Sequence, residues 1–495
     1  MPHESAGPPP LAILLRCAAR LAPRVRYVFD TLLLTAGIPV VYVDEPPGAG
    51  PWLLYAPDKS AVPQAALVRC LAVAHSPEVW PLFDGAQDVE AARAVDGIAT
   101  VFAQSSPQFD GSLDIRFDLA ANAFYFLSSW SERVGRDKAQ TRRMFSDTLH
   151  ARGQVPQDIV DRYLDRLVQR VHALCAQVGV APWPAAQRPG DGDYAVVLSH
   201  DVDFVPYGQL DNARQGAKTI LRHLVRQRDA GDAARAAGGL VRAWASGRDP
   251  YGCVPEIIAR ERSMGVQSSF QVAVGHRHPD DVNYHIDDDG IRDYLRAIPD
   301  AGFDLCLHGS YRSTENATWY IDEVALLAER LGRPRGSRQH FLSFDYDALF
   351  AAQELAGIEY DMSMGFPDHP GPRAGFSHPY FPFDLRNNRP FKVLQISLFL
   401  MDVTLRGYMG LKGTRAWAVI ERCLDELRAK RGCVSIVWHP IVFGGARDPG
   451  YDRLYWNLIE HVQTNGGVAT DGRTVNSFWR AEAARYPSFG FAGHS

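Results

Sequence analysis

Residues 194–203 have the sequence YAVVLSHDVD, a short apolar run that ends in polar residues. The pattern recurs along the rest of the chain, and a stretch of helical character usually separates one run from the next. The apolar runs are residues 194–203, 268–277, 303–310, 337–341, 358–365, 392–402 and 434–440. Continuous apolar strands are typical of a parallel sheet that helices cover on both faces. We therefore expect an α/β fold with a (β/α) barrel, although a doubly wound open sheet would give a similar sequence.

The length of the chain indicates more than one domain. Its 495 residues exceed what a single hydrophobic core usually fills. Residues 181–193, APWPAAQRPGDGD, have the composition of a linker. We predict a smaller α/β domain of unknown role over residues 1–180, and the barrel over residues 194–495 with a helical insertion near residues 209–248.

Composition excludes several classes of protein. Lys and Arg number 52 against 57 Asp and Glu, so the net charge of -5 gives no basic excess for binding nucleic acid. The seven cysteines include no CxxC pair and favour a reducing compartment. Apolar stretches are too short or too interrupted for a membrane span. We expect a cytoplasmic protein of open oligomeric state.

Polar residues follow the apolar runs at the strand ends. In α/β barrels the carboxyl ends of all strands share one face, so residues distant in sequence can meet there. This convergence is our hypothesis for an active site. The residues are His200, Asp201, Asp203, His276, His278, His308, His340, Asp402 and His439.

Asp201 and Asp203 end the first run at positions i and i+2. Because side chains alternate along a strand, both carboxylates should point the same way. Two carboxylates so close repel unless a cation lies nearby, so the pair suggests one metal ligand and one general base. The alternative is a strand-to-loop turn in which an Asp caps the backbone.

Three further residues extend this hypothesis. His308 ends an apolar run, and imidazole is a good ligand for zinc or iron. Arg338 and His340 share one strand face, so Arg338 could fix Asp201 by a bidentate ion pair while His340 supplies a metal nitrogen. Alternatively, these side chains simply line a polar barrel mouth.

The last two runs end in Asp402 and His439. A histidine held by a carboxylate stays protonated near neutral pH and serves as a general acid. The sequence therefore offers a candidate base and a candidate acid on different strands.

The ordered motifs resemble those of the polysaccharide deacetylase family, the NodB-homology group of carbohydrate esterases. The motifs are SHDVD (199–203), LHGSY (307–311), SRQHF (337–341), GIEYDMSMGFPDHPGPRAG (357–375), LFLMD (398–402) and VWHP (437–440). The branch met in surface-polysaccharide gene clusters, which has an extra N-terminal domain, is the most similar. The resemblance covers about residues 190–480 and implies a distorted (β/α) barrel, a divalent metal and removal of acetyl groups from sugars.

Position by position, the resemblance makes Asp201 the base and Asp203 a metal ligand. His308 matches the first histidine of the second motif, but Arg312 occupies the position of its second histidine. The usual third ligand is thus absent. His340 is the candidate replacement, with His200 and His276 as further possibilities.

The remaining motifs supply the other roles. Arg338 matches the arginine of the third motif, Asp402 the carboxylate that orients the acid, and His439 the acid. Arg373 in the substrate cleft, and Tyr311 and Trp438 as aromatic platforms, are the expected substrate contacts.

The sequence thus predicts a metal-dependent hydrolase, with zinc as the metal. Its expected substrate is an N-acetylated (or O-acetylated) sugar of a surface polysaccharide or its precursor, as a monomeric sugar nucleotide, a lipid-linked glycan or a polymer. Two alternatives remain open: a non-catalytic carbohydrate-binding scaffold with a degenerate metal site, and a metal-independent C–N hydrolase.

Overall fold

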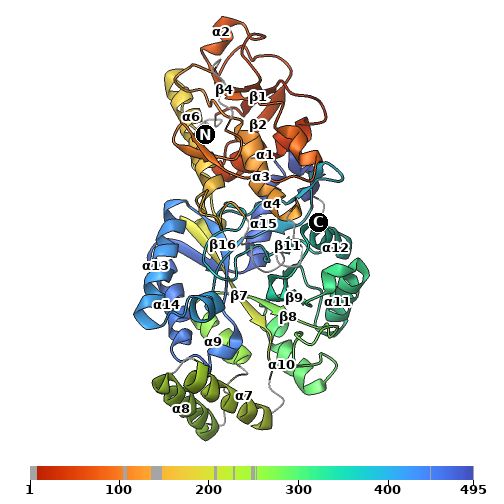
Figure 1. Cartoon of the computed structure of the whole chain (residues 1–495), viewed down its shortest axis with the longest axis vertical. Helices are drawn as coiled ribbons and strands as arrows, with labels where there is room; N and C mark the ends of the chain where they lie inside the picture. The colour runs from red at the N-terminus through yellow and green to blue at the C-terminus, as the bar shows by residue number, and fades with distance from the viewer. Residues whose placement is uncertain are drawn as a thin grey trace, which may run out of the picture. The chain divides into compact units, whose positions relative to one another are not determined.

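The computed structural model describes residues 8–103, 109–134, 148–205, 209–226, 229–246, 251, 253–445 and 447–493. The chain forms two compact units, drawn in Figure 1. Unit 1 comprises Met1–Gln187, Ala374–Lys392 and Phe478–Ser495, and unit 2 comprises Arg188–Arg373 and Val393–Ser477. Unit 1 contains three separate segments of the chain, so its limits cannot be described by one boundary. The domain boundary predicted at residues 181–193 therefore stays a prediction. Positions 227–228 and 247–248 of the predicted insertion lie outside the described residues.

Unit 1 is built on a parallel four-stranded sheet in the order β2-β1-β3-β4. Its strands are β1 (Leu11–Leu15), β2 (Val40–Val43), β3 (Trp52–Ala56) and β4 (Cys70–Ala74). Two antiparallel pairs accompany it, β5 (Arg93–Val95) with β6 (Ile98–Thr100), and β12 (Phe383–Asp384) with β13 (Arg389–Pro390). The helices are α1 (Ala22–Ala36), α2 (Gln64–Leu67), α3 (Leu119–Leu127), α4 (Trp130–Val134) and α6 (Ile159–Gln177). An α/β fold for this part of the chain agrees with the prediction.

Unit 2 contains a larger, entirely parallel sheet in the order β14-β11-β10-β9-β8-β7-β16-β15, with β17 also paired to β7. The strands are β7 (Tyr194–Val202), β8 (Ser269–Val272), β9 (Asp304–Gly309), β10 (Gly336–Gln339), β11 (Tyr360–Asp361), β14 (Leu394–Gln395), β15 (Leu398–Met401), β16 (Cys433–Val437) and β17 (Gly467–Thr470). All nine residues of β7 are buried, as expected of a strand covered on both faces. Strand β17 was not predicted. Its sequence, GVAT, is only four residues long, and three of these residues are half-buried in the structure.

The sheet closes on itself through one segment. Strand β14 pairs with β11 at one end of the strand order, and β15 pairs with β16 at the other. Only two residues separate β14 from β15 in the chain, so residues 394–401 join the two ends of the sheet. The short pairings and the break between β14 and β15 make the barrel distorted. The predicted class, an α/β fold with a distorted (β/α) barrel, is confirmed.

Helices lie between most of these strands along the chain (Figure 1). They are α7 (Gln209–Leu221), α8 (Ala230–Ser246), α9 (Val254–Ser263), α10 (Asp289–Asp300), α11 (Ala317–Arg330), α12 (Tyr346–Ala356), α13 (Gly413–Ala429), α14 (Tyr451–Thr464) and α15 (Gly472–Ala483). Within the described parts of the chain, every helix is too short or too polar to cross a bilayer.

A buried glutamate on α11 holds the loop that follows β9. Glu323 is 2% exposed and accepts hydrogen bonds from the backbone N–H and the hydroxyl of Ser310. Arg277 Nη1 lies 3.3 Å from the same carboxylate. Burial raises the pKa of Glu323 to about 7, although the Ser310 hydrogen bonds and the charge of Arg277 act in the opposite direction.

This raised pKa predicts a pH-dependent stability. The carboxyl group is protonated in the folded state up to about pH 7, whereas the unfolded chain loses the proton near 4.5. Stability is therefore full below the lower value and is lost as the pH rises through the higher one. Between about pH 5 and about pH 8 the wild type should lose roughly 2 kcal/mol of unfolding free energy relative to Glu323→Gln. Urea denaturation of both proteins at both pH values measures this, and parallel pH profiles would contradict it.

Candidate metal and catalytic site

The carboxyl ends of five barrel strands carry the candidate residues. Because all strands are parallel, these ends lie on one edge of the sheet. Asp201 belongs to β7 and Asp203 follows it; His308 belongs to β9 and Arg338 to β10; Asp402 follows β15, and His439 lies two residues beyond β16.

Because side chains alternate along β7, its polar residues point to opposite faces of the sheet. Asp201 and Asp203 point toward the candidate site, where they contact Arg338 and His308. His200 points the other way and is fully buried: its Nδ1 lies 2.6 Å from the Trp438 carbonyl and its Nε2 lies 3.0 Å from Glu261. His200 therefore has a structural environment and does not belong to the metal cluster.

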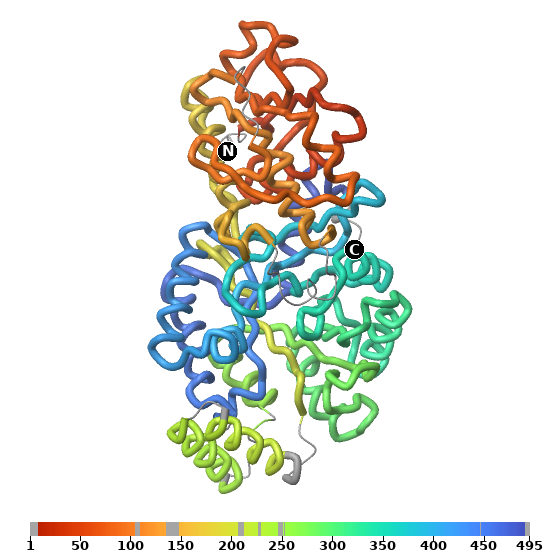
Figure 2. The backbone as a smooth tube through the Cα atoms, viewed as in Figure 1, coloured from red at the N-terminus to blue at the C-terminus, as the bar shows by residue number. Residues whose placement is uncertain are grey.

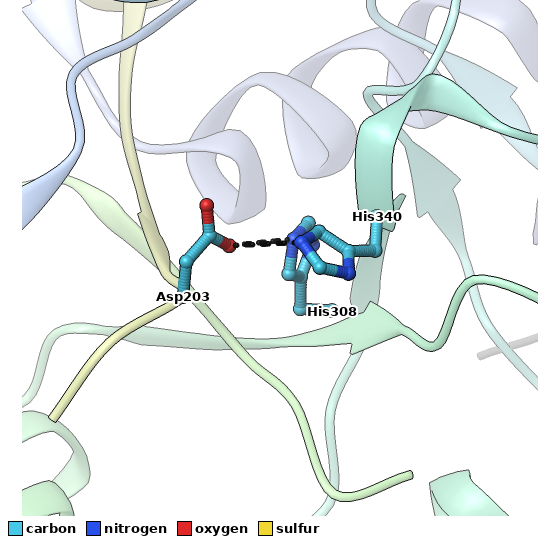
Figure 3. Close-up of side chains that lie close together, drawn as sticks. All are labelled: Asp203, His308 and His340. Atoms are coloured by element: carbon cyan, nitrogen blue, oxygen red, sulfur yellow. Dashed lines mark ion pairs between the residues drawn. The ribbon is translucent and has the colours of Figure 1, made fainter. Parts of the chain in front are cut away.

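Asp203, His308 and His340 form a cluster that could hold a metal ion (Figure 3). One ligand atom from each lies within 4.8 Å of the others. Asp203 Oδ1 is 3.1 Å from His308 Nε2 and 3.7 Å from His340 Nε2. One carboxylate and two imidazoles suit a first-row divalent metal, and this number of ligands leaves coordination positions open.

The protonation of His308 fits a ligand role. Its Nδ1 lies 3.0 Å from the backbone carbonyl of Arg338, which can only accept, so Nδ1 carries the proton. In the neutral ring, Nε2 then has a lone pair, and this atom lies 3.1 Å from Asp203 Oδ1. Both His308 Nε2 and Asp203 Oδ1 are buried and make no hydrogen bond of acceptable geometry, although they are close. A shared cation would satisfy both atoms.

His340 reaches the cluster through an unusual backbone. The next two residues, Phe341 and Leu342, have φ values of 57° and 53°, in the left-handed region that side chains other than glycine rarely adopt. Strain of this kind is concentrated at functional sites. Asp281 Oδ1 lies 4.0 Å from His340 Nδ1. Sequence reasoning missed Asp281, although an acidic residue in the loop after β8 was a usable signal.

Arg338 is fully buried, and each of its three guanidinium nitrogens has a partner. Nη1 donates to Asp201 Oδ1 at 2.6 Å, Nη2 to the Ser199 hydroxyl at 2.9 Å, and Nε to the Met362 carbonyl at 2.9 Å. The expected bidentate pair is therefore corrected to a single contact, because Ser199 takes the second nitrogen. This contact fixes Asp201 and compensates its charge.

His439 and Asp402 form a tight pair. His439 Nδ1 lies 2.6 Å from Asp402 Oδ1, and Nε2 lies 3.4 Å from Asp203 Oδ2. Burial lowers the pKa of His439, but the charge and hydrogen bond of Asp402, with the charges of Asp203 and Asp201, outweigh it and raise the pKa to about 9. On its other side, Asp402 is 3.4 Å from Arg406 Nε.

The other predicted residues lie in different surroundings. Arg312 is half-exposed and near Glu315, away from the cluster. His276 packs against the ring of His285, and Tyr311 against that of His278. The guanidinium of Arg373 lies 4.9 Å from the centre of the Phe344 ring.

Trp438 is fully buried, and its indole N–H donates to the Tyr451 carbonyl. Its ring has no surface to offer a sugar, which corrects the expectation that it would serve as an aromatic platform.

Comparisons with known proteins give likenesses among solved structures only. No family model matches the chain, and no curated protein matches it. A Mycobacterium smegmatis protein provisionally named a polysaccharide deacetylase is 16% identical, with a TM-score of 0.41, over 61% of this chain and 95% of its own. The allantoinase PuuE is 15% identical, with a TM-score of 0.40, over 59% of this chain and 92% of its own. A Bdellovibrio bacteriovorus peptidoglycan deacetylase is 12% identical, with a TM-score of 0.25, over 71% of this chain and 87% of its own.

The buried Arg338–Asp201 pair makes a testable prediction. Arg338→Met should destabilise the fold by about 3–5 kcal/mol, because it leaves Asp201 buried without its cation. The control Arg335→Met, which breaks a half-exposed pair with Glu359, should cost less than about 1 kcal/mol. Adding Asp201→Asn to Arg338→Met should recover part of the loss. Equal unfolding free energies for the two single variants in urea would contradict this prediction.

Proposed function

We propose that this protein is a metal-dependent hydrolase that removes N-acetyl, or O-acetyl, groups from a sugar of a surface polysaccharide or its precursor. The observation that carries the proposal is the convergence of three groups at one barrel edge. These are the Asp203, His308 and His340 cluster, the Asp201–Arg338 pair and the Asp402–His439 pair. A metal site beside one carboxylate and one carboxylate-bound histidine suits hydrolysis of an acyl group.

Asp203, His308 and His340 would hold the metal ion. We take zinc as the ion, because one carboxylate and two imidazoles with open positions are typical of catalytic zinc. When bound, such an ion supplies Lewis acidity, which makes a nearby carbonyl more electrophilic and a nearby water more acidic.

Asp201 is the proposed general base. Its Oδ1 is bound by Arg338, so Oδ2 is the oxygen that would take the proton from the attacking water. That water adds to the carbonyl carbon of the acetyl group. Because Arg338 is fully buried and has three partners, the orientation of Asp201 is fixed before substrate arrives.

His439 is the proposed general acid. Because the pKa of His439 is raised, the imidazole carries a proton at neutral pH. The hydrogen bond between its Nδ1 and Asp402 orients the ring so that Nε2 points toward the other site residues. Nε2 would give its proton to the sugar amine as the C–N bond breaks. An amide needs this step more than an ester does, because an amine is a poor leaving group unless it is protonated.

Tyr311 and Arg373 remain the proposed substrate contacts, and Arg373, which is 4% exposed and packs over the Phe344 ring, would contact substrate only at its exposed edge. The backbone N–H of Tyr311 already donates to Asp281, and that of Ser310 to Glu323. These two hydrogen bonds hold the backbone of the loop after β9. The ring of Tyr311 is therefore the part of this residue that would contact a sugar.

The base assignment has a direct test. Asp201→Asn should remain folded and retain bound metal, but should release acetate from N-acetylated oligosaccharides at least about a hundredfold more slowly than the wild type. Acetate release is followed enzymatically, and metal content by mass spectrometry. Full turnover by the variant would refute the role of Asp201. A wild type that binds the sugar but has no activity would favour the non-catalytic carbohydrate-binding scaffold. A wild type that hydrolyses a C–N bond without releasing acetate would favour the metal-independent C–N hydrolase.

The third ligand has its own test, which does not depend on activity. His340→Ala should lower the affinity for zinc by about 10-fold to 100-fold or more, because one of three protein ligands is lost. Arg312→Ala is the matched control and should leave the affinity unchanged, since its side chain is half-exposed and outside the cluster. Competition with a chromogenic chelator measures both values. A wild type that takes up no zinc, or equal affinities for wild type and His340→Ala, would overturn this ligand set.

A further inference from the structure

Helices α7 and α8 pack against each other as a pair that belongs to unit 2 (Figure 2). Each helix buries one side. On the first helix and its π-helical extension Arg222–Arg226, Thr219 and His223 are buried. On the second, Ala236 and Ala243 are buried. Gly216 of the first helix lies close to the Leu240 side chain of the second, whereas His223 Nε2 lies 2.9 Å from the carbonyl of Arg447, outside the pair.

A second, apolar stripe on each helix is exposed. Leu221, Leu224 and Val225 are 60%, 48% and 67% exposed and have the i, i+3, i+4 spacing of one helix face. On α8, Val241 and Trp244 are 63% and 76% exposed and are three residues apart. In the described part of the chain, eleven large hydrophobic residues are exposed, and five of them lie on this pair. We call these five residues the apolar patch.

The same segment is strongly basic. Residues 209–248 contain eight Arg and Lys against three Asp, a net charge of +5 in a chain whose net charge is -5. Arg214, Lys218 and Arg242 are among the exposed members. Leucine, valine and tryptophan beside exposed basic residues are typical of helices that lie in the interface of an anionic membrane.

We propose that the α7–α8 pair docks unit 2 on the surface of an anionic lipid bilayer. The apolar patch enters the boundary between headgroups and acyl chains, where the amphipathic ring of tryptophan is favoured. The basic side chains pair with the acidic headgroups. Charge complementarity selects this occupant over a second copy of the chain, because two copies of a segment with a net charge of +5 would repel each other.

The pair is also connected to the candidate site. Arg222, which directly follows α7, lies 3.0 Å from Asp448, and Asp448 lies 2.9 Å from Arg406. Arg406 in turn contacts Asp402, the partner of His439. Docking would therefore keep the site near the lipid surface. This inference about the substrate rests on the proposed function. If the protein removes acetyl groups from a glycan while docked on a bilayer, its substrate is a lipid-linked glycan.

Vesicle co-sedimentation of the full-length protein tests the docking. The wild type should sediment with vesicles that contain phosphatidylglycerol and phosphatidylcholine, and should stay in solution with phosphatidylcholine alone. Binding should weaken in high salt, since the headgroup attraction is screened. Leu221→Asp/Trp244→Asp should reduce the bound fraction by about tenfold or more, because it places two charges in the apolar patch. Leu355→Asp is the matched control on α12, since Leu355 is 72% exposed, and it should bind like the wild type.

Several outcomes would overturn the proposal. They are a wild type that does not sediment with anionic vesicles, binding that is equal on neutral vesicles, and a double variant that binds as well as Leu355→Asp. A wild-type dimer that the double variant dissociates, without vesicle binding, would identify a second copy as the occupant. No substrate is present in these measurements, so a failure to dock leaves the proposed hydrolysis untouched, and inactivity toward glycans leaves docking untouched.

Discussion

The burial of one positive charge organises the candidate site. Arg338 has no exposed surface, so every guanidinium nitrogen must find a partner inside the barrel. Its side chain binds Asp201 and Ser199 on β7, and its own carbonyl accepts the Nδ1 proton of His308 on β9. One residue of β10 thus fixes the proposed base and a proposed metal ligand together. The geometry of the site depends on this charge being satisfied.

A network of alternating charges surrounds that centre. Asp203 faces three histidines, of which His439 is held from behind by Asp402. Asp402 also contacts Arg406, and that arginine contacts Asp448. Such a network keeps several buried charges paired while it leaves Asp203 with imidazoles as neighbours. A divalent ion bound among these groups would add the positive charge that the proposed hydrolysis requires.

Much of the fold could be predicted because buried strands have continuous apolar sequence. The runs at residues 194–203 and 303–310 contain strands β7 and β9 within one residue of the predicted ends. The run at residues 392–402 was predicted as one strand, but the structure divides it into β14 and β15. Hydrophobicity cannot show this division, because residues 393–402 are all buried and only their pairing partners change. Pairing with β11 and then with β16 decides where each strand begins and ends.

For the candidate site, the sequence by itself determined that Asp201 and Asp203 share a strand face, because side chains alternate along any strand. His200 was kept as a possible ligand until the structure placed it against Trp438 and Glu261. Only the tertiary structure decided which histidine joins Asp203 and His308. His340, directly after β10, does so, and the backbone is left-handed at the next two residues, Phe341 and Leu342, whereas Arg312 stays half-exposed. Distances between residues far apart in the chain depend on strand pairing and loop backbone angles, which no local pattern encodes.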